Sequence, residues 1–395
     1  MNLRYISFRF PGYFLEQKIT LRYKRFTDKN SQVSRLDNFA DEFIRAVKQK
    51  KNPSICGLDP LVSSLPPKIK DRHRHLNSPE GVADAILEFN MDIIDAVCDI
   101  VPAVKPQMAY YEKYGIPGLR AFQQTVSYAR SKGLVVIEDA KRNDIGRTAQ
   151  QYADGHIGEV GLLDETSIPM FDVDCMTVNA YLGSDGVKPF LGYCGNGKGI
   201  FVLDKTSNDS SSELQDRLVL LTMDESLRID ERLRGKGLGL DDLPAFKNYE
   251  NMIARIRSNE ADVAPLYVVM ARLIDKWGSA PEFVGENGYS SVGAVVGATY
   301  PEEAKVLREL MPHAILLGPG YRTQGGTGED AANLFNDDGF GAGVNNSSGM
   351  TFAYQKKPFS AFYGPNEFAD AARIAAQRMK EDIVGALQKA GKWDL

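Results

Sequence analysis

The segment Val136-Ile-Glu-Asp-Ala-Lys-Arg-Asn-Asp-Ile-Gly146 places three charged residues, Asp139, Lys141 and Asp144, at the end of an apolar run. Side chains two residues apart on a strand share a face, so we expect Asp139 and Lys141 to point the same way at the strand's end. Asp144, three residues further on, can fold back over them or reach a neighbouring subunit. Charges crowded at a strand end are costly to bury unless they are paired, and such crowding is typical of a site that shifts a pKa or moves a proton.

Apolar runs recur along the whole chain, and most of them are followed by a helical pattern. The predicted strands are Ser54–Leu58, Pro102–Lys105, Leu134–Asp139, Cys175–Asn179, Ile200–Asp204, Val292–Gly297, Ala314–Gly318 and the more polar Gly341–Asn345. Spacing and composition predict helices over Pro79–Ile100, Pro301–Met311 and Phe368–Ala390. Near-continuous apolar strands that alternate with helices indicate a parallel sheet covered on both faces. Eight such units predict an α/β fold, a (β/α)8 TIM barrel, and the alternative is an open doubly wound sheet.

Two segments depart from this alternation of strands and helices. Residues 1–36 begin with a basic stretch and are predicted to be an N-terminal extension; a targeting segment is the alternative, although Pro11-Gly12 breaks the helix that such a segment would form. Residues 37–395 are predicted to be a single barrel domain. Between the fifth and sixth strands, residues 209–259 are charge-rich and predict a helical insertion with a flexible turn at its glycines.

The composition of the chain is that of an ordinary globular protein with a substantial core, since 43% of the 395 residues are hydrophobic and 25% are charged. A formal net charge of -5 argues against nucleic acid as a partner and gives no support to a membrane-surface role. No apolar stretch approaches the roughly 18 residues of a membrane span. The four cysteines form no C-x-x-C pair, so we expect reduced thiols and a cytoplasmic protein.

The carboxyl ends of the predicted strands collect the residues that can carry chemistry. In a barrel, function lies at these ends. They gather two lysines and three aspartates, namely Lys105, Lys141, Asp59, Asp139 and Asp144. So many charges converging on one barrel mouth are hard to explain as solvated surface, and they predict an active site there.

The loop Gly318–Gly326, after the seventh strand, is a candidate phosphate site. Its glycines can expose backbone N–H groups to an anion, and Arg322 can add a bidentate, charge-assisted contact. No comparable pattern predicts a metal site, because His73 and His75 have no acidic or cysteine partner at ligand spacing.

In order along the chain, these segments resemble the motifs of the orotidine 5′-phosphate decarboxylase family, in its longer bacterial-type branch. The matching segments are Gly57–Pro60, Lys105–Glu112, Asp139–Gly146 with Thr148, Thr177–Gly183, Phe201–Asn208, Val296–Thr299 and Pro319–Gly326. The Asp-x-Lys-x-x-Asp core alone is shared with related sugar-phosphate decarboxylases, whereas the full set is specific to the family.

The resemblance implies a barrel that forms a homodimer, with the strand mouths at the interface, and converts orotidine 5′-phosphate to UMP and CO2 without a metal or an organic cofactor. It implies that Lys141 donates the proton to C6 of the pyrimidine. Lys105, Asp139 and Asp144 complete the charged network, and Asp144 comes from the other subunit. The implied substrate contacts are Asp59 and Thr148 at the ribose hydroxyls, Ser207 at the pyrimidine, and Gln324 between the base and the phosphate. Gly325 and Arg322, in the loop after the seventh strand, are the candidates for contacts with the phosphate itself.

The phosphate site departs from the family pattern at two positions. The family usually has an arginine after the serine in the eighth-strand segment, where it clamps the phosphate, whereas this chain has Ser348. At position 322, where many relatives have a small residue, this chain has arginine, and our hypothesis is that Arg322 takes over the anchor. Two alternatives stay open: a Mg²⁺-dependent sugar-phosphate decarboxylase or aldolase on the same barrel, and a non-catalytic barrel that binds UMP.

Overall fold

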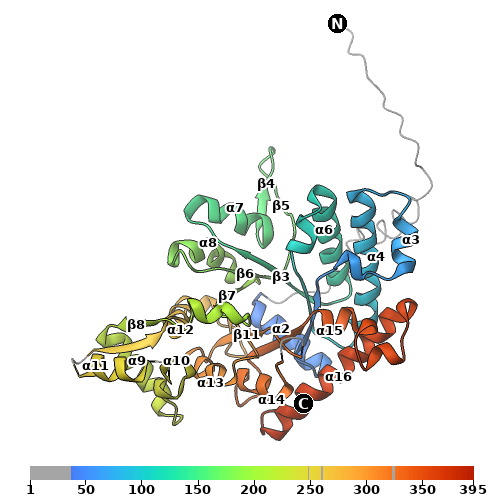
Figure 1. Ribbon diagram of the computed structural model, residues 1–395. Helices are drawn as coiled ribbons and strands as arrows, with labels where there is room; N and C mark the ends of the chain where they lie inside the picture. The colour runs from blue at the N-terminus through green and yellow to red at the C-terminus, as the bar shows by residue number, and fades with distance from the viewer. Residues whose placement is uncertain (1–36, 248, 259–260, 323–324) are drawn as a thin grey trace. The chain divides into compact units, whose positions relative to one another are not determined.

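A closed barrel of eight parallel strands forms the centre of the computed structural model, which describes residues 37–247, 249–258, 261–322 and 325–395 (Figure 1). The strands follow one another around the barrel in the order β1-β12-β11-β10-β7-β6-β3-β2. Their bounds are β1 Ser54–Leu58, β2 Ala103–Pro106, β3 Val135–Arg142, β6 Cys175–Val178, β7 Gly199–Lys205, β10 Ser290–Val296, β11 Ala314–Gly318 and β12 Ala342–Asn346. The predicted (β/α)8 TIM barrel is confirmed, and all eight predicted strands are present. The predicted N-terminal extension, residues 1–36, lies outside the described residues.

The barrel strands form where the sequence is almost uniformly apolar, because both of their faces are covered. Every residue of β1, β6, β10, β11 and β12 is buried. The packing is tight at Gly293 of β10, where a Cβ would lie 2.3 Å from the carbonyl oxygen of Ile315 and 2.7 Å from the ring of Phe201. No side chain fits there, so glycine is what allows the neighbouring strands to approach.

Helices surround the barrel. Their bounds are α2 Phe39–Lys50, α3 Pro67–His73, α4 Pro79–Val97, α5 Ala109–Glu112, α6 Gly115–Ser131, α7 Gly146–His156, α8 Ser184–Cys194, α12 Leu266–Gly278, α13 Pro301–Leu310, α14 Gly328–Ala331, α15 Ser348–Thr351 and α16 Phe368–Lys389. The three helices predicted from the sequence correspond to α4, α13 and α16. Helix α4 begins where its local signals place it, since Ser78 accepts the N–H of Gly81 and Pro79 occupies the first turn. In the part of the chain that the structure describes, no helix combines the length and apolarity needed to cross a membrane.

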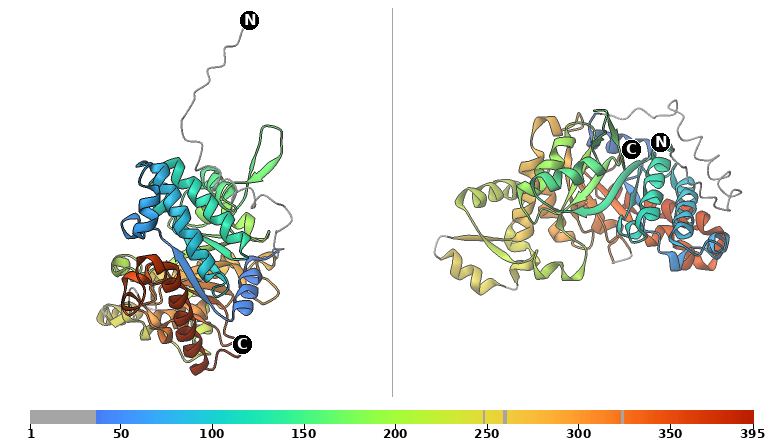
Figure 2. Two further views of the ribbon diagram at one scale, coloured as in Figure 1. Left: turned by 90° about the vertical axis from the view of Figure 1, so that its right-hand side faces the viewer. Right: turned by 90° about the horizontal axis from the view of Figure 1, so that it is seen from above.

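Two additions interrupt the alternation of strands and helices. The insertion between β7 and β10 contains α9 Met223–Arg234, α10 Pro244–Lys247 and α11 Glu250–Arg257, and its strand β8 Leu218–Leu221 pairs antiparallel with β9 Asp262–Pro265. The prediction of a helical insertion missed this ribbon, whose second strand lies just beyond residue 259. A second antiparallel pair, β4 Glu159–Gly161 and β5 Ser167–Pro169, projects from the barrel after α7 (Figure 1 and Figure 2).

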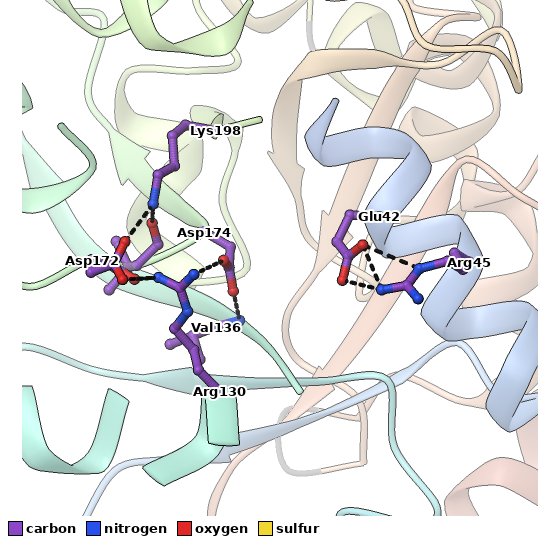
Figure 3. A network of polar contacts seen from close by, with 8 residues as sticks. Glu42, Arg45, Arg130, Val136, Asp172, Asp174 and Lys198 are labelled. Carbon is purple, nitrogen blue, oxygen red and sulfur yellow. Dashed lines mark hydrogen bonds and ion pairs between the residues drawn. The ribbon is translucent and has the colours of Figure 1, made fainter. Parts of the chain in front are cut away.

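A polar network joins the amino ends of β3 and β6 to α6 (Figure 3). Asp174 accepts the backbone N–H of Val136 at 2.8 Å and lies 3.8 Å from Arg130, while Lys198 donates to Asp172 at 2.9 Å. Burial alone would raise the pKa of Asp172, but Lys198 and Arg130 outweigh it and lower that pKa. The network lies at the end of the barrel opposite the strand mouths, where side chains serve stability rather than chemistry.

Candidate active site

The end of β3 is irregular, and this irregularity positions the charged residues. The strand runs as far as Arg142, and its register against β6 shifts between Glu138 and Arg142. Lys141 has a φ of 51°, a left-handed conformation that is uncommon for residues other than glycine. Asp139 and Lys141 therefore meet, as predicted, but through a local kink and not through regular two-residue alternation.

Thr177 of β6 holds the kinked backbone. Its Oγ1 accepts the N–H of Lys141 at 2.9 Å and donates to Oδ1 of Asp139 at 3.0 Å. Thr177 is not among the site residues predicted from the sequence. The signal that was available is its position near the carboxyl end of the strand beside β3.

Asp139 bridges two lysines at the strand mouths. Its Oδ2 lies 2.7 Å from Nζ of Lys105, and its Oδ1 lies 2.5 Å from Nζ of Lys141. The Lys105 side chain is only 4% exposed, whereas that of Lys141 is 46% exposed. One ammonium is thus fixed in the core, and the other keeps donors that can face a substrate.

Opposite charges keep Asp139 and Lys105 ionised. Burial alone would raise the pKa of Asp139, but Lys105 and Lys141 outweigh it and hold the pKa well below its usual range. Burial would likewise lower the pKa of Lys105, yet Asp139 and Asp59 outweigh it and raise that pKa. Asp139 and Lys105 are therefore a fixed pair of opposite charges at neutral pH.

Asp59 follows β1 and belongs to the same cluster of charges. Burial raises the pKa of its carboxyl, against the opposing effects of Lys105 and of a hydrogen bond with Ser347. Ser347 approaches β1 this closely because Gly57 has no side chain, since a Cβ there would lie 2.0 Å from the Ser347 Oγ. The buried Oδ1 of Asp59 has no hydrogen-bond partner within the described segments, so it can accept a hydroxyl from a ligand.

Asp144 and Thr148 are predicted site residues that the single chain does not bring into the cluster. Asp144 uses its Oδ1 to accept the N–H of Ile145 at 2.8 Å, and it forms no ion pair with Lys141 among the residues described. Thr148 is exposed on the first turn of α7. Both residues remain at the surface near the strand mouths, where a second subunit could use them.

Exposed apolar side chains lie beside Asp144. Ile145 is 54% exposed, Tyr181 is 74% exposed and Leu182 is 45% exposed. A Cβ on Gly186 would lie 3.1 Å from the carbonyl oxygen of Asp144 and 3.5 Å from Leu182, so α8 brings these residues next to Asp144. Large apolar side chains gathered on a surface are typical of an interaction site.

The remaining predicted residues belong to the loops after β7 and β11. Ser207 is half-buried after β7. Gln324 lies outside the described residues, and Gly325 has a φ of 98°, which favours glycine. The Arg322 side chain is 61% exposed, and its Nη2 lies 3.1 Å from Oδ2 of Asp382 on α16.

A cavity of about 480 Å³ opens beside Arg322, lined from the ends of β11 and β12, from the segment between α15 and α16, and from α16 itself. The polar side chains that line it are Tyr321, Arg322, Asn346, Lys356, Lys357 and Arg378. Four of these side chains are cations, which suits an anionic ligand. The loops after the seventh and eighth barrel strands, here β11 and β12, are where barrels often bind phosphate.

Histidines and cysteines contribute no ligand set in the described part of the chain. No three His, Cys, Asp or Glu side chains there gather closely enough to hold a metal ion. His73 is hydrogen-bonded to Glu88 at 2.7 Å, and His75 is hydrogen-bonded to the carbonyl oxygen of Arg72 at 2.9 Å. The four cysteines are free thiols.

Known proteins share both the sequence pattern and the fold. Residues 82–234 match the model of the orotidine 5′-phosphate decarboxylase / HUMPS family. The chain is 34% identical to the orotidine 5′-phosphate decarboxylase of Rhodopirellula baltica, over 88% of this chain and 99% of that protein. The chain belongs to the orotidine 5′-phosphate decarboxylase family. It is also 35% identical to the orotidine 5′-phosphate decarboxylase of Petrotoga mobilis, over 87% of this chain and 97% of that protein. The structure of Leishmania donovani OMP decarboxylase, 23% identical, shares the fold with a TM-score of 0.58 over 88% of this chain and 98% of that one.

In this member of the decarboxylase family, Asp139→Asn should lower the free energy of unfolding by about 3 kcal/mol at pH 7, because the buried Lys105 loses its counter-charge. The pKa of Asp139 is lower in the folded protein than in the unfolded chain. The stabilisation that its carboxylate provides is therefore complete above roughly pH 4 and is lost as the pH falls. Urea unfolding of the wild-type protein and of Asp139→Asn, at pH 7 and at about pH 3, measures the difference in the free energy of unfolding. This difference should be smaller at the lower pH. An equal difference at both pH values would contradict this assignment.

Proposed function

We propose that this chain decarboxylates orotidine 5′-phosphate to UMP and CO2. The observation that carries the proposal is the bridge from Lys105 through Asp139 to Lys141, at the strand mouths of a barrel from this family. Such a site offers a fixed, partly exposed ammonium, which suits a reaction that develops negative charge on carbon. The proposed setting is pyrimidine biosynthesis in the cytoplasm.

In the proposed mechanism Lys141 replaces CO2 with a proton. Loss of CO2 breaks the bond between C6 and the carboxylate carbon and leaves the electron pair at C6. The Lys141 ammonium stabilises this charge and then transfers a proton to C6, which forms UMP and leaves a neutral amine. Because the Lys141 side chain is 46% exposed, the amine can regain a proton from water. Asp139 holds the Lys141 ammonium in position before the reaction, through the ion pair at 2.5 Å.

The proposed substrate contacts extend from this centre towards the cavity. Asp59 binds a ribose hydroxyl through its unpartnered Oδ1, and Ser207 contacts the pyrimidine. Gln324 bridges the base and the phosphate, and Gly325 and Arg322 contact the phosphate. Binding energy gained at the phosphate can then be used at the distant reacting carbon.

We propose that the active form is a homodimer in which Asp144 and Thr148 of each subunit complete the site of the other. Asp144 has no ion pair with Lys141 of its own chain in the described structure. The exposed Ile145, Tyr181 and Leu182 supply apolar area beside it for a subunit contact.

The absorbance of orotidine 5′-phosphate, followed with the wild-type protein in the presence of EDTA, tests the proposed function. We expect turnover that EDTA leaves intact, with one CO2 released for each UMP formed. Turnover that EDTA abolishes would favour the Mg²⁺-dependent sugar-phosphate chemistry, and UMP binding without turnover would favour a non-catalytic barrel. Either result would overturn the proposal.

A further inference from the structure

Because residue 348 is a serine, the end of β12 lacks the positive charge that the family pattern has there. In the family pattern an arginine occupies this place and clamps the phosphate, and a serine hydroxyl cannot supply that charge. The neighbouring cavity still carries four cationic side chains, those of Arg322, Lys356, Lys357 and Arg378. The cation that lies against residue 348 is the one best placed to compensate.

Lys356 is the cation that contacts residue 348 directly. Its Nζ donates to Oγ of Ser348 at 2.7 Å, from the segment that joins α15 to α16. Within the described residues Lys356 forms no ion pair with an aspartate or a glutamate. Burial lowers its pKa, and an anion bound beside it would favour the charged form again.

Arg322 is already engaged with other groups. Its Nη2 lies 3.1 Å from Asp382, and its Nε donates to Oη of Tyr321 at 3.4 Å. To bind an anion Arg322 must share its charge with Asp382 or leave it. Arg378 lies over the ring of Phe359, with 5.1 Å between the guanidinium carbon and the ring centroid, and forms a second positive wall of the cavity.

We propose that Lys356 is the principal phosphate anchor of this chain and supplies from α15–α16 the charge that Ser348 lacks. The inference rests on the proposed function, because the phosphate in question is that of orotidine 5′-phosphate. One donor of the Lys356 ammonium stays on the Ser348 hydroxyl, and the other two face the phosphate oxygens. A lysine acts here as a point charge, where arginine would bind two oxygens in one plane.

Lys356→Ala should raise the KM for orotidine 5′-phosphate by about 10- to 100-fold, the range expected when one charge-assisted hydrogen bond is lost. Binding of UMP should weaken by a similar factor, while uridine, which has no phosphate, should bind within about twofold of wild type. Arg322→Ala should weaken UMP binding less than Lys356→Ala does. Steady-state kinetics and calorimetric titration with UMP and uridine measure these effects.

Two further variants separate anchoring from folding. The double variant Lys356→Ala/Ser348→Arg should regain most of the lost affinity, because it restores an arginine at the family's position. Lys68→Ala on α3 removes an exposed lysine outside the cavity lining and should leave KM unchanged. If Lys356→Ala is poorly folded, Lys356→Gln offers a closer match in shape, and thermal unfolding checks both proteins.

An unchanged KM and unchanged UMP affinity in folded Lys356→Ala would overturn the inference while leaving the proposed function in place. Failure of the wild-type protein to release CO2 would overturn the proposed function. The role of Lys356 as the phosphate anchor would still be tested, by comparing the UMP affinity of Lys356→Ala with that of wild type. Wild-type protein that binds UMP no more tightly than uridine would also overturn the inference.

Discussion

Lys141→Ala should lower kcat by at least about 10⁴-fold, because one side chain both stabilises the developing charge and delivers the proton. Binding of UMP should weaken much less, since the proposed ribose and phosphate contacts lie elsewhere in the site. Single-turnover measurement of CO2 release reports the chemical step directly. Wild-type protein and the variant are compared at saturating orotidine 5′-phosphate, so that binding does not enter.

Lys141→Arg is the matched variant for this prediction. Arginine keeps the positive charge beside Asp139, but its pKa is too high for it to give up a proton readily. We therefore expect Lys141→Arg to remain far below wild type in kcat, although it retains the charge. Near-normal turnover by either variant in a folded protein would exclude Lys141 as the proton donor.

The barrel could be predicted from sequence because each buried parallel strand appears in the sequence as a short apolar run. Even the polar segment Gly341–Asn345 overlaps a strand, β12, which is buried throughout. Its glycine has a packing reason, since a Cβ on Gly343 would lie 2.6 Å from Ile55 and 2.8 Å from Phe43. The β8–β9 ribbon escaped prediction because its pairing joins segments about forty residues apart, and local pattern does not report such pairing.

The cluster of charges at the strand mouths was predictable for a geometric reason. The carboxyl ends of parallel strands meet at one rim of a barrel, so Lys105 and Asp139 had to lie near each other. The left-handed backbone at Lys141 and its support from Thr177 were not predictable, because they depend on the register shift between β3 and β6. The same holds for Lys356, whose contact with Ser348 depends on how the segment before α16 folds back.

Asp144 is the residue on which the proposed dimer can be tested most sharply. Within one chain its carboxylate accepts only a neighbouring backbone N–H in the described structure, beside exposed apolar side chains. If Asp144 acts in the site of the partner, Asp144→Ala should lower kcat by about 10²- to 10³-fold, as expected when a group that supports the charged transition state is removed. The loss alone does not say which subunit supplies the residue.

Mixing two inactive proteins, Lys141→Ala and Asp144→Ala, should restore about one quarter of wild-type activity after random subunit exchange. About half of the dimers are then mixed, and a shared site at a two-fold interface leaves each mixed dimer one site with both changes and one with neither. If Asp144 instead serves its own chain, every site in the mixture carries one change and no activity returns. A mixture of Lys141→Ala with Lys141→Arg is the negative control. Its subunits exchange in the same way, but no dimer that forms contains Lys141, so no activity should return. Recovery in the first mixture and none in the second would place Asp144 across the interface, where its charge can complete the network that Asp139 begins.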